Sequence, residues 1–207
     1  LLVGEVWICS GQSNMAWTVS SSHNYEAEKT SAQHPKLRHF KVANKTANTP
    51  QATCVGSWAV CSPETVGGFT AVGYFFGRKL LTDLDVPIGL LHTSWGGTPA
   101  EAWTSQPALT GNAQLSHVIG DWSKRMEGFP AEVAKYEQTL AKWQTSAAAA
   151  KAAGKPAPNK PRAPEGDASP HKPASLYNGM IAPLLPYTVR GAIWYQGESN
   201  AGRSAEY

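Results

Sequence analysis

Short apolar runs alternate with polar turns along the first hundred residues and again near the end of the chain. Each run has the length of a buried or half-buried strand, and Leu37–Val42 also alternates with period two. The hydrophobic positions of 69–84 recur at helical spacing, which predicts a crossover helix between parallel strands. The pattern predicts strands over residues 7–9, 37–42, 58–60, 86–94 and 189–195.

The remaining segments are more polar. Residues 20–35 predict a loop or a short helix, and Ser62–Thr65 has the cap, N1 proline and early acidic residue of a helix start. The chain is helical in pattern from 106 to 153 and then proline-rich to 164, so we expect a surface insertion at about 106–175. Asp167 and His171 lie in that charged surface segment, which favours a structural role for both.

Three predicted strands end in polar turns that carry glycine. These turns are Gly11–Met15, Trp95–Trp103 and Gln196–Asn200. Because the carboxyl ends of parallel strands meet at one rim of a sheet, we expect the three turns to lie together where ligands bind. Ser13 follows the first strand and is the candidate nucleophile, although such a turn taken alone is more typical of a helix cap.

The serine turn differs from the G-x-S-x-G elbow of α/β-hydrolases, since Asn14 and Met15 follow Ser13. Acyl transfer needs a hydroxyl, a base and donors aimed at the developing oxyanion. Ser13 supplies the hydroxyl and one backbone N–H, and the Gly96–Gly97 turn supplies a second N–H. The side-chain amide of Gln196 is the candidate third donor.

Composition narrows the class of protein. The chain has 207 residues, 42% hydrophobic and 16% charged, which suits one domain with a core. The formal charge of +3 is dispersed, so nucleic acid is not an expected partner, and no apolar run is long enough to span a membrane. Cys54 and Cys61 either pair across a hairpin or stay free thiols. We expect no metal site and no cofactor, and the oligomeric state stays open.

Three motifs carry a family resemblance. The segments Gly11–Met15, Ser94–Trp103 and Trp194–Ala201 resemble the signature blocks of the sialate O-acetylesterase family, within the SGNH-hydrolase superfamily. The resemblance implies an α/β, three-layer flavodoxin-like SGNH-hydrolase fold with a parallel sheet, in which 1–207 form a partial esterase domain. It implies Ser13 as nucleophile, an acetylated carbohydrate as substrate, and a secreted or periplasmic location.

The resemblance leaves several roles open. The usual third block of the superfamily is a Gly-x-Asn-Asp turn whose asparagine is a donor. If Gly197 is aligned with its glycine, Ser199 takes the place of that asparagine, so we favour Gln196 as the donor. Glu198 either orients the catalytic histidine or holds its turn. Asn14, Trp95 and Trp103 are candidates for support of the site or contact with the sugar, and buried tryptophans at strand ends are as common as sugar-stacking ones.

The general base of this superfamily is a histidine in an Asp-x-x-His turn after the last strand, and this sequence has no such turn. All six histidines precede the third block: His23, His34, His39, His92, His117 and His171. We expect a chain that stops before the last strand of the domain. Two functions follow: part of a serine-dependent O-acetylesterase acting on sialic acid or related acetylated sugars, or a non-catalytic carbohydrate-binding module.

Overall fold

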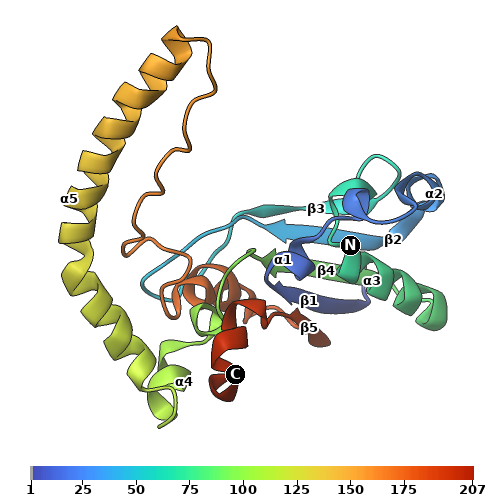
Figure 1. The fold of residues 1–207 in the computed structure, drawn as a ribbon. Helices are drawn as coiled ribbons and strands as arrows, with labels where there is room; N and C mark the ends of the chain where they lie inside the picture. The colour runs from blue at the N-terminus through green and yellow to red at the C-terminus, as the bar shows by residue number, and fades with distance from the viewer. Residues whose placement is uncertain (1) are drawn as a thin grey trace.

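A single five-stranded sheet organises the chain (Figure 1). The computed structural model describes residues 2–207, apart from the side chain of residue 206. The strand order is β3-β2-β4-β1-β5, which places the first strand of the chain next to the last. The strands are β1 Glu5–Gly11, β2 His34–Val42, β3 Gly56–Cys61, β4 Ile88–Ser94 and β5 Gly191–Tyr195.

Four strands run parallel, and β3 alone runs antiparallel, to β2. Residues 43–55 join β2 to β3 and contain no helix, so the chain has no crossover that would bring β3 back parallel. The expected parallel sheet is therefore confirmed for β1, β2, β4 and β5, with an antiparallel edge strand added. All five predicted strands are present.

The helices cover the predicted segments, and short 3₁₀ or π turns fill most connections. The α-helices are α1 Ser13–Ala16, α2 Tyr25–Ser31, α3 Ala71–Leu84, α4 Gln106–Gly111 and α5 His117–Ala152. The 3₁₀ segments are η1 Val19–Ser21, η2 Val66–Gly68, η3 Ala100–Trp103, η5 Ala182–Leu184 and η6 Glu198–Glu206, and η4 Tyr177–Ile181 is a π-helical turn.

The expected helix start at Ser62 is wrong. Residues 62–65 form a turn in which Ser62 O accepts from the N–H groups of Thr65 and Val66, and η2 follows. The pair Gly67–Gly68 costs too much conformational entropy to continue as regular helix. The helix begins instead at Ala71, where the Thr70 hydroxyl caps the N–H of Gly73 at 3.4 Å.

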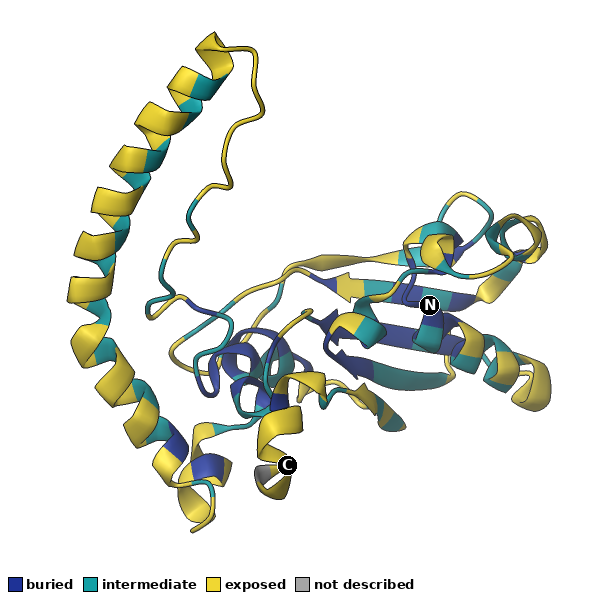
Figure 2. Ribbon diagram, viewed as in Figure 1, coloured by how far each residue is buried: buried dark blue, intermediate teal, exposed yellow. Residues whose placement is uncertain are grey.

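Apolar side chains pack on both faces of the sheet, which makes the domain three-layered, and Figure 2 shows the buried residues gathered in and beside the strands. One face packs on α3, and the other on η3, η4 and η5. The cluster toward α3 includes Cys9, Met15, Leu37, Tyr74, Ile88 and Leu90. The opposite cluster includes Val42, Leu91, Trp103, Leu176, Met180 and Leu184. The three-layer α/β architecture is confirmed.

Residues 117–164, which form α5 and the proline-rich return, extend away from the sheet. In Figure 1, α5 is a long yellow-green arm and the proline-rich return runs back beside it in orange. The two are in contact where the Trp143 indole N–H donates to Pro158 O at 2.8 Å and the Lys160 ammonium lies 5.8 Å from the Trp143 ring centroid. Most of this arm is exposed (Figure 2).

The three cysteines are free thiols, with Cys9 and Cys61 buried and Cys54 half-buried. Burial raises the pKa of Cys9 to about 12 and that of Cys61 to about 11, which suits inert core thiols. Within residues 2–207, no helix has both the length and the apolar character needed to cross a bilayer.

Gly11 is the point at which three strand ends meet. It faces Ser94 of β4 on one side and Tyr195 of β5 on the other. Its carbonyl accepts from Trp95 N at 3.1 Å, and the next N–H, that of Gln12, donates to Tyr195 O at 2.9 Å. A Cβ on Gly11 would lie 2.0 Å from Tyr195 O, and its φ of +139° disfavours any L side chain.

We predict that Gly11→Ala destabilises the fold by roughly 3 kcal/mol, because the methyl group collides with backbone and the residue is strained. Chemical denaturation of both proteins measures the difference. Gly68→Ala is the matched control, since a Cβ there meets nothing within 4 Å. Equal stabilities for Gly11→Ala and Gly68→Ala would show that the junction tolerates a side chain.

Two histidines are buried side by side under α3. The rings of His39 and His92 lie 5.2 Å apart, and His39 stacks on Phe69. Burial, followed by the charges of His92 and Lys41, lowers the pKa of His39 to about 3. Burial and the Lys41 charge lower the pKa of His92 to about 4. Both rings are therefore neutral in the folded protein at neutral pH.

These pKa shifts predict that stability falls with acidification. Between the ordinary histidine pKa of 6.5 and the folded values, the unfolded chain binds more protons than the folded one, so the free energy of unfolding rises with pH. Each histidine contributes up to about 1.4 kcal/mol per pH unit. Urea unfolding between pH 5 and pH 6.5 measures the slope.

The variant His92→Leu should show a shallower slope than the wild type, by up to about 1.4 kcal/mol per pH unit near pH 5, since one titrating group is removed. His23→Gln, at an exposed position outside the core, is the control and should keep the wild-type slope. A wild-type stability that does not change across this window would contradict burial of the two neutral rings.

Candidate active site

Ser13 is the first residue of α1 and lies exposed directly beyond the end of β1. The short helix is held by the start of α3, because the Thr70 hydroxyl donates to Met15 O at 2.6 Å and Ala71 N donates to Trp17 O at 2.8 Å. The buried Met15 side chain anchors the same turn in the core. The sheet and the start of α3 thus hold the Ser13 hydroxyl at the rim.

The Gly96–Gly97 turn lies beside Ser13. A Cβ built on Gly96 would be 3.4 Å from the Ser13 Cβ, so a side chain at position 96 would lie directly against the serine. Gly97 has a φ of +76°, in the left-handed region that favours glycine. The Thr98 hydroxyl closes the turn by donating to Trp95 O at 2.7 Å. The first two predicted turns therefore meet as expected.

Gln196 reaches the same rim but is already engaged. Its Nε2 donates to Thr98 O at 3.2 Å and to Asn200 Oδ1 at 2.8 Å. Because Asn200 Oδ1 also accepts from Ala100 N at 2.9 Å, that atom is an acceptor and the Gln196 amide orientation follows. To donate to an oxyanion, the Gln196 amide has to leave one of these acceptors. That role stays a prediction.

Gln12 is a residue of the site that the sequence reasoning did not single out. Its buried Oε1 accepts the backbone N–H groups of Gly197 and Ser199, both at 3.3 Å, and so ties the serine turn to the third turn. Asn14 Nδ2 donates to Glu198 Oε1 across the same gap. The sequence feature that could have indicated this role is the position of the Gln12 amide between an apolar strand and the start of a helix.

A second missed group is the set around Asn200. Its Nδ2 donates to Glu101 Oε2 at 2.8 Å, and Glu101 also pairs with Arg203. Burial works to raise the pKa of Glu101, but hydrogen bonds from Arg203 and Asn200 outweigh it and the pKa is lowered. Glu101 is therefore a carboxylate that joins the second turn to the third.

The histidines occupy other places. His92 is buried, with Nε2 2.6 Å from Ser94 Oγ. His171 lies at the rim after all: Nε2 is 3.0 Å from Gly97 O and Nδ1 is 2.5 Å from Glu165 Oε2. Within residues 2–207, no side chain hydrogen-bonds to the Ser13 hydroxyl.

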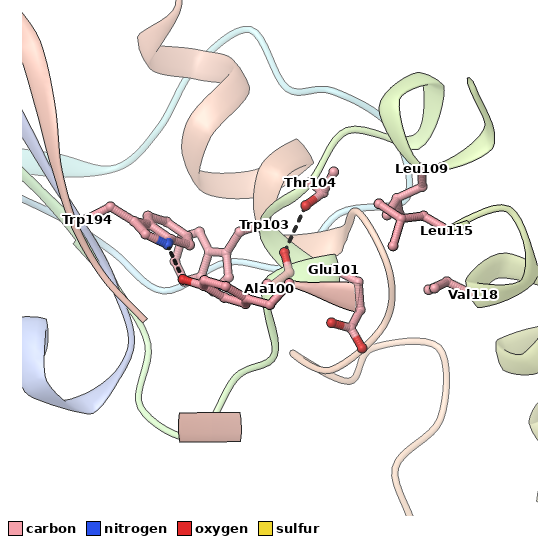
Figure 3. Close-up of a pocket in the computed structure, with 9 residues that line it drawn as sticks. Ala100, Glu101, Trp103, Thr104, Leu109, Leu115, Val118 and Trp194 are labelled. Atoms are coloured by element: carbon pink, nitrogen blue, oxygen red, sulfur yellow. Dashed lines mark hydrogen bonds between the residues drawn. The ribbon is translucent and has the colours of Figure 1, made fainter. Parts of the chain in front are cut away.

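A pocket of about 330 Å³ opens beside the third turn (Figure 3). Trp103 and Trp194 form one wall, meeting edge-on with ring centroids 6.2 Å apart, and apolar residues of α4, α5 and their connection form the other. Trp103 is 6% exposed and its indole N–H donates to Thr98 Oγ1 at 2.8 Å. Its contact with a sugar, like that of the half-buried Trp95, stays a prediction.

The chain is similar to known esterases over nearly its whole length. It is 34% identical over 214 residues to the sialate O-acetylesterase of Rattus norvegicus and 32% identical over 210 residues to that of Homo sapiens. Each comparison covers 97% of this chain and 36% or 32% of the relative. The chain thus spans about a third of the length of these curated relatives.

A solved structure agrees with these relatives. A carbohydrate acetylesterase from Xanthomonas citri superposes with a TM-score of 0.67 at 32% identity, covering 96% of this chain and 33% of the other. The model of the family described as carbohydrate esterase, sialic acid-specific acetylesterase matches residues 3–153. This match extends through α5. The chain belongs to the sialic acid-specific acetylesterase family of carbohydrate esterases.

Proposed function

We propose that Ser13 is the nucleophile of a carbohydrate O-acetylesterase that removes acetyl groups from sialic acid or related acetylated sugars. The observation that carries the proposal is the placement of an exposed serine, at a helix start, against the Gly96–Gly97 turn. Acyl transfer requires a nucleophile held rigidly beside N–H donors for the oxyanion, and a serine at a strand end beside a glycine turn can supply both. The family to which the chain belongs supports the same reaction.

In the proposed reaction, Ser13 Oγ attacks the acetyl carbonyl carbon while a base takes its proton. The carbonyl oxygen becomes an oxyanion, which accepts from the N–H of Ser13, from an N–H of the Gly96–Gly97 turn and from the Gln196 amide. The sugar oxygen leaves with the proton. Water then attacks the acetyl-serine and releases acetate, with the same base accepting and returning the proton.

The base is proposed to come from outside residues 2–207, and the proposal is supported by the chain spanning only about a third of the length of its esterase relatives. We propose that residues 1–207 form the nucleophile and oxyanion part of a larger esterase domain, with 106–175 as an insertion into it. Glu198 and Asn14, which contact each other, support the serine turn. Trp95 and Trp103 contact the sugar, and the protein acts outside the cytosol.

The 207-residue chain alone should hydrolyse aryl acetates and O-acetylated sialic acid only slowly, since a nucleophile without its base retains a small residue of catalysis. A longer protein that also contains the base should be fully active, and Ser13→Ala should reduce its kcat about 10⁴-fold or more. Acetate release measures both. Ser123→Ala, on the exposed surface of α5, is the control and should leave kcat unchanged.

Two results would contradict the proposal. Rapid hydrolysis by the 207-residue chain that depends on Ser13 would mean that one of its own histidines is the base. Binding of an acetylated sugar with no Ser13-dependent turnover in the longer protein would favour the carbohydrate-binding module instead.

The variant Gln196→Met tests the third oxyanion donor, because it removes the amide while keeping a similar shape. If the amide donates in the transition state, kcat should fall about 10²-fold or more while KM changes little. Thermal unfolding measured in parallel separates this from the loss of the Thr98 and Asn200 hydrogen bonds. An unchanged kcat together with a lower Tm would assign Gln196 to structure alone.

A further inference from the structure

The end of the 106–175 segment returns to the rim and places three side chains against each other. Glu165 Oε2 accepts from the Ser169 hydroxyl at 2.7 Å and lies 2.5 Å from His171 Nδ1. Ser169 Oγ in turn accepts the His171 backbone N–H at 3.0 Å. Asp167, the acid nearest in sequence that the motif suggested, pairs with Lys172 instead. The His171 ring is thus held in one orientation.

The two nitrogens of His171 both face acceptors. Nδ1 faces the Glu165 carboxylate and Nε2 faces the carbonyl oxygen of Gly97. A carbonyl and a carboxylate cannot donate, so each nitrogen has to carry a hydrogen for both bonds to form. The arrangement therefore selects the imidazolium form of His171.

The carboxylate partner is suited to a cation. Burial works to raise the pKa of Glu165, but hydrogen bonds from Ser169 and His171 and the charges of His171 and Arg162 lower it. The other charged or titratable groups around His171 line a neighbouring pocket of about 270 Å³: Glu101, His117, Asp121, Arg125 and Arg203. Glu101 and Arg203 neutralise each other, which leaves Glu165 as the direct counter-ion.

The target of the His171 bond is the turn that lies against Ser13. A Cβ built on Gly97 would meet nothing within 4 Å, so packing does not fix this residue. Hydrogen bonds fix the turn instead: Thr98 Oγ1 to Trp95 O, Gln196 Nε2 to Thr98 O, and His171 Nε2 to Gly97 O. Of these three donors, only the His171 imidazole can gain or lose a charge.

We propose that Glu165 and His171 form a positioning pair: His171, as an imidazolium held by Glu165, fixes the Gly97 carbonyl and so keeps the N–H groups of the Gly96–Gly97 turn aimed at the oxyanion. This inference rests on the proposed function of that turn. His171 touches neither substrate nor Ser13 in this role. Its loss misaims a donor, and its effect falls on kcat more than on KM.

The pair predicts a particular pH profile. A catalytic base must be neutral, so it gives activity that rises with pH, whereas His171 must be protonated, so it gives activity that falls as the ring loses its proton. In the longer, active protein, kcat for an aryl acetate should therefore decrease on the alkaline side of the pH profile, and this alkaline limb should be due to His171. We expect His171→Ala to lower kcat about 10-fold with KM nearly unchanged, and to lack this limb.

The conservative variant separates positioning from folding. In His171→Gln, the amide still donates to Gly97 O but does not titrate, so kcat should recover to within about threefold of the wild type and stay flat on the alkaline side. His23→Gln, at an exposed position, is the control and should keep the wild-type profile. A wild-type limb retained in both His171 variants would overturn the proposal.

A second measurement does not depend on catalysis. Nitrogen-15 NMR of the 207-residue chain reports how many hydrogens the His171 ring carries, and the Gly97 and Thr98 amide shifts should follow its titration. A neutral His171 ring at pH 6, or amide shifts indifferent to its titration, would overturn the pair even if Ser13 proved catalytic. Conversely, a positive NMR result with no Ser13-dependent turnover would leave the pair intact and remove the proposed function.

Discussion

The absence of a side chain at Gly11 is the constraint on which the rest of the site depends. The carbonyl of Gly11 binds the chain leaving β4, and the next N–H binds the last residue of β5. Tyr195 O approaches so closely that no other residue fits. Because backbone hydrogen bonds leave little freedom over such short distances, the three turns have one relative position. The relative positions of Ser13, Gly96 and Gln196 therefore follow from backbone contacts at Gly11.

Polar side chains add further hydrogen bonds and an ion pair between the three turns. Gln12 holds the turn after β5, Asn200 holds the turn after β4, and Glu101 neutralises Arg203 beside them. Each of these groups is satisfied by partners from a different strand end. Such a network is costly when any member is missing, since the others are then left buried and unpaired. The serine is thus surrounded by residues that are fixed before any substrate arrives.

The sheet was predictable because its strands are short, apolar and bounded by glycine or proline, and because parallel pairing follows from a crossover helix such as α3. The antiparallel direction of β3 was not predictable from the sequence pattern, because it depends on whether residues 43–55 contain a helix. The crossover helix expected over 69–84 is α3, but the helix start expected at Ser62 is wrong, because a cap motif carries no information about the diglycine after it.

The candidate site also contains residues that could be predicted from the sequence and residues that could not. Ser13 and Gly96 could be placed together because each follows a predicted strand of one sheet. Gln12, Asn200 and His171 could not, because their roles arise from contacts with residues between 74 and 187 positions away. For His171 the local sequence favoured a surface role, and only the path of the return segment brings it to Gly97.

The long arm formed by α5 has a separate consequence for how the molecule moves. Its 36 residues extend over about 54 Å and are mostly exposed, so its stability comes from its own backbone hydrogen bonds rather than from a core. Such a helix opens locally at far lower free energy than a central strand, and frays from its tip. We therefore expect the amide hydrogens of the arm to exchange faster than those of the central strands. The arm begins a short way along the chain from the Gly96–Gly97 turn of the candidate active site.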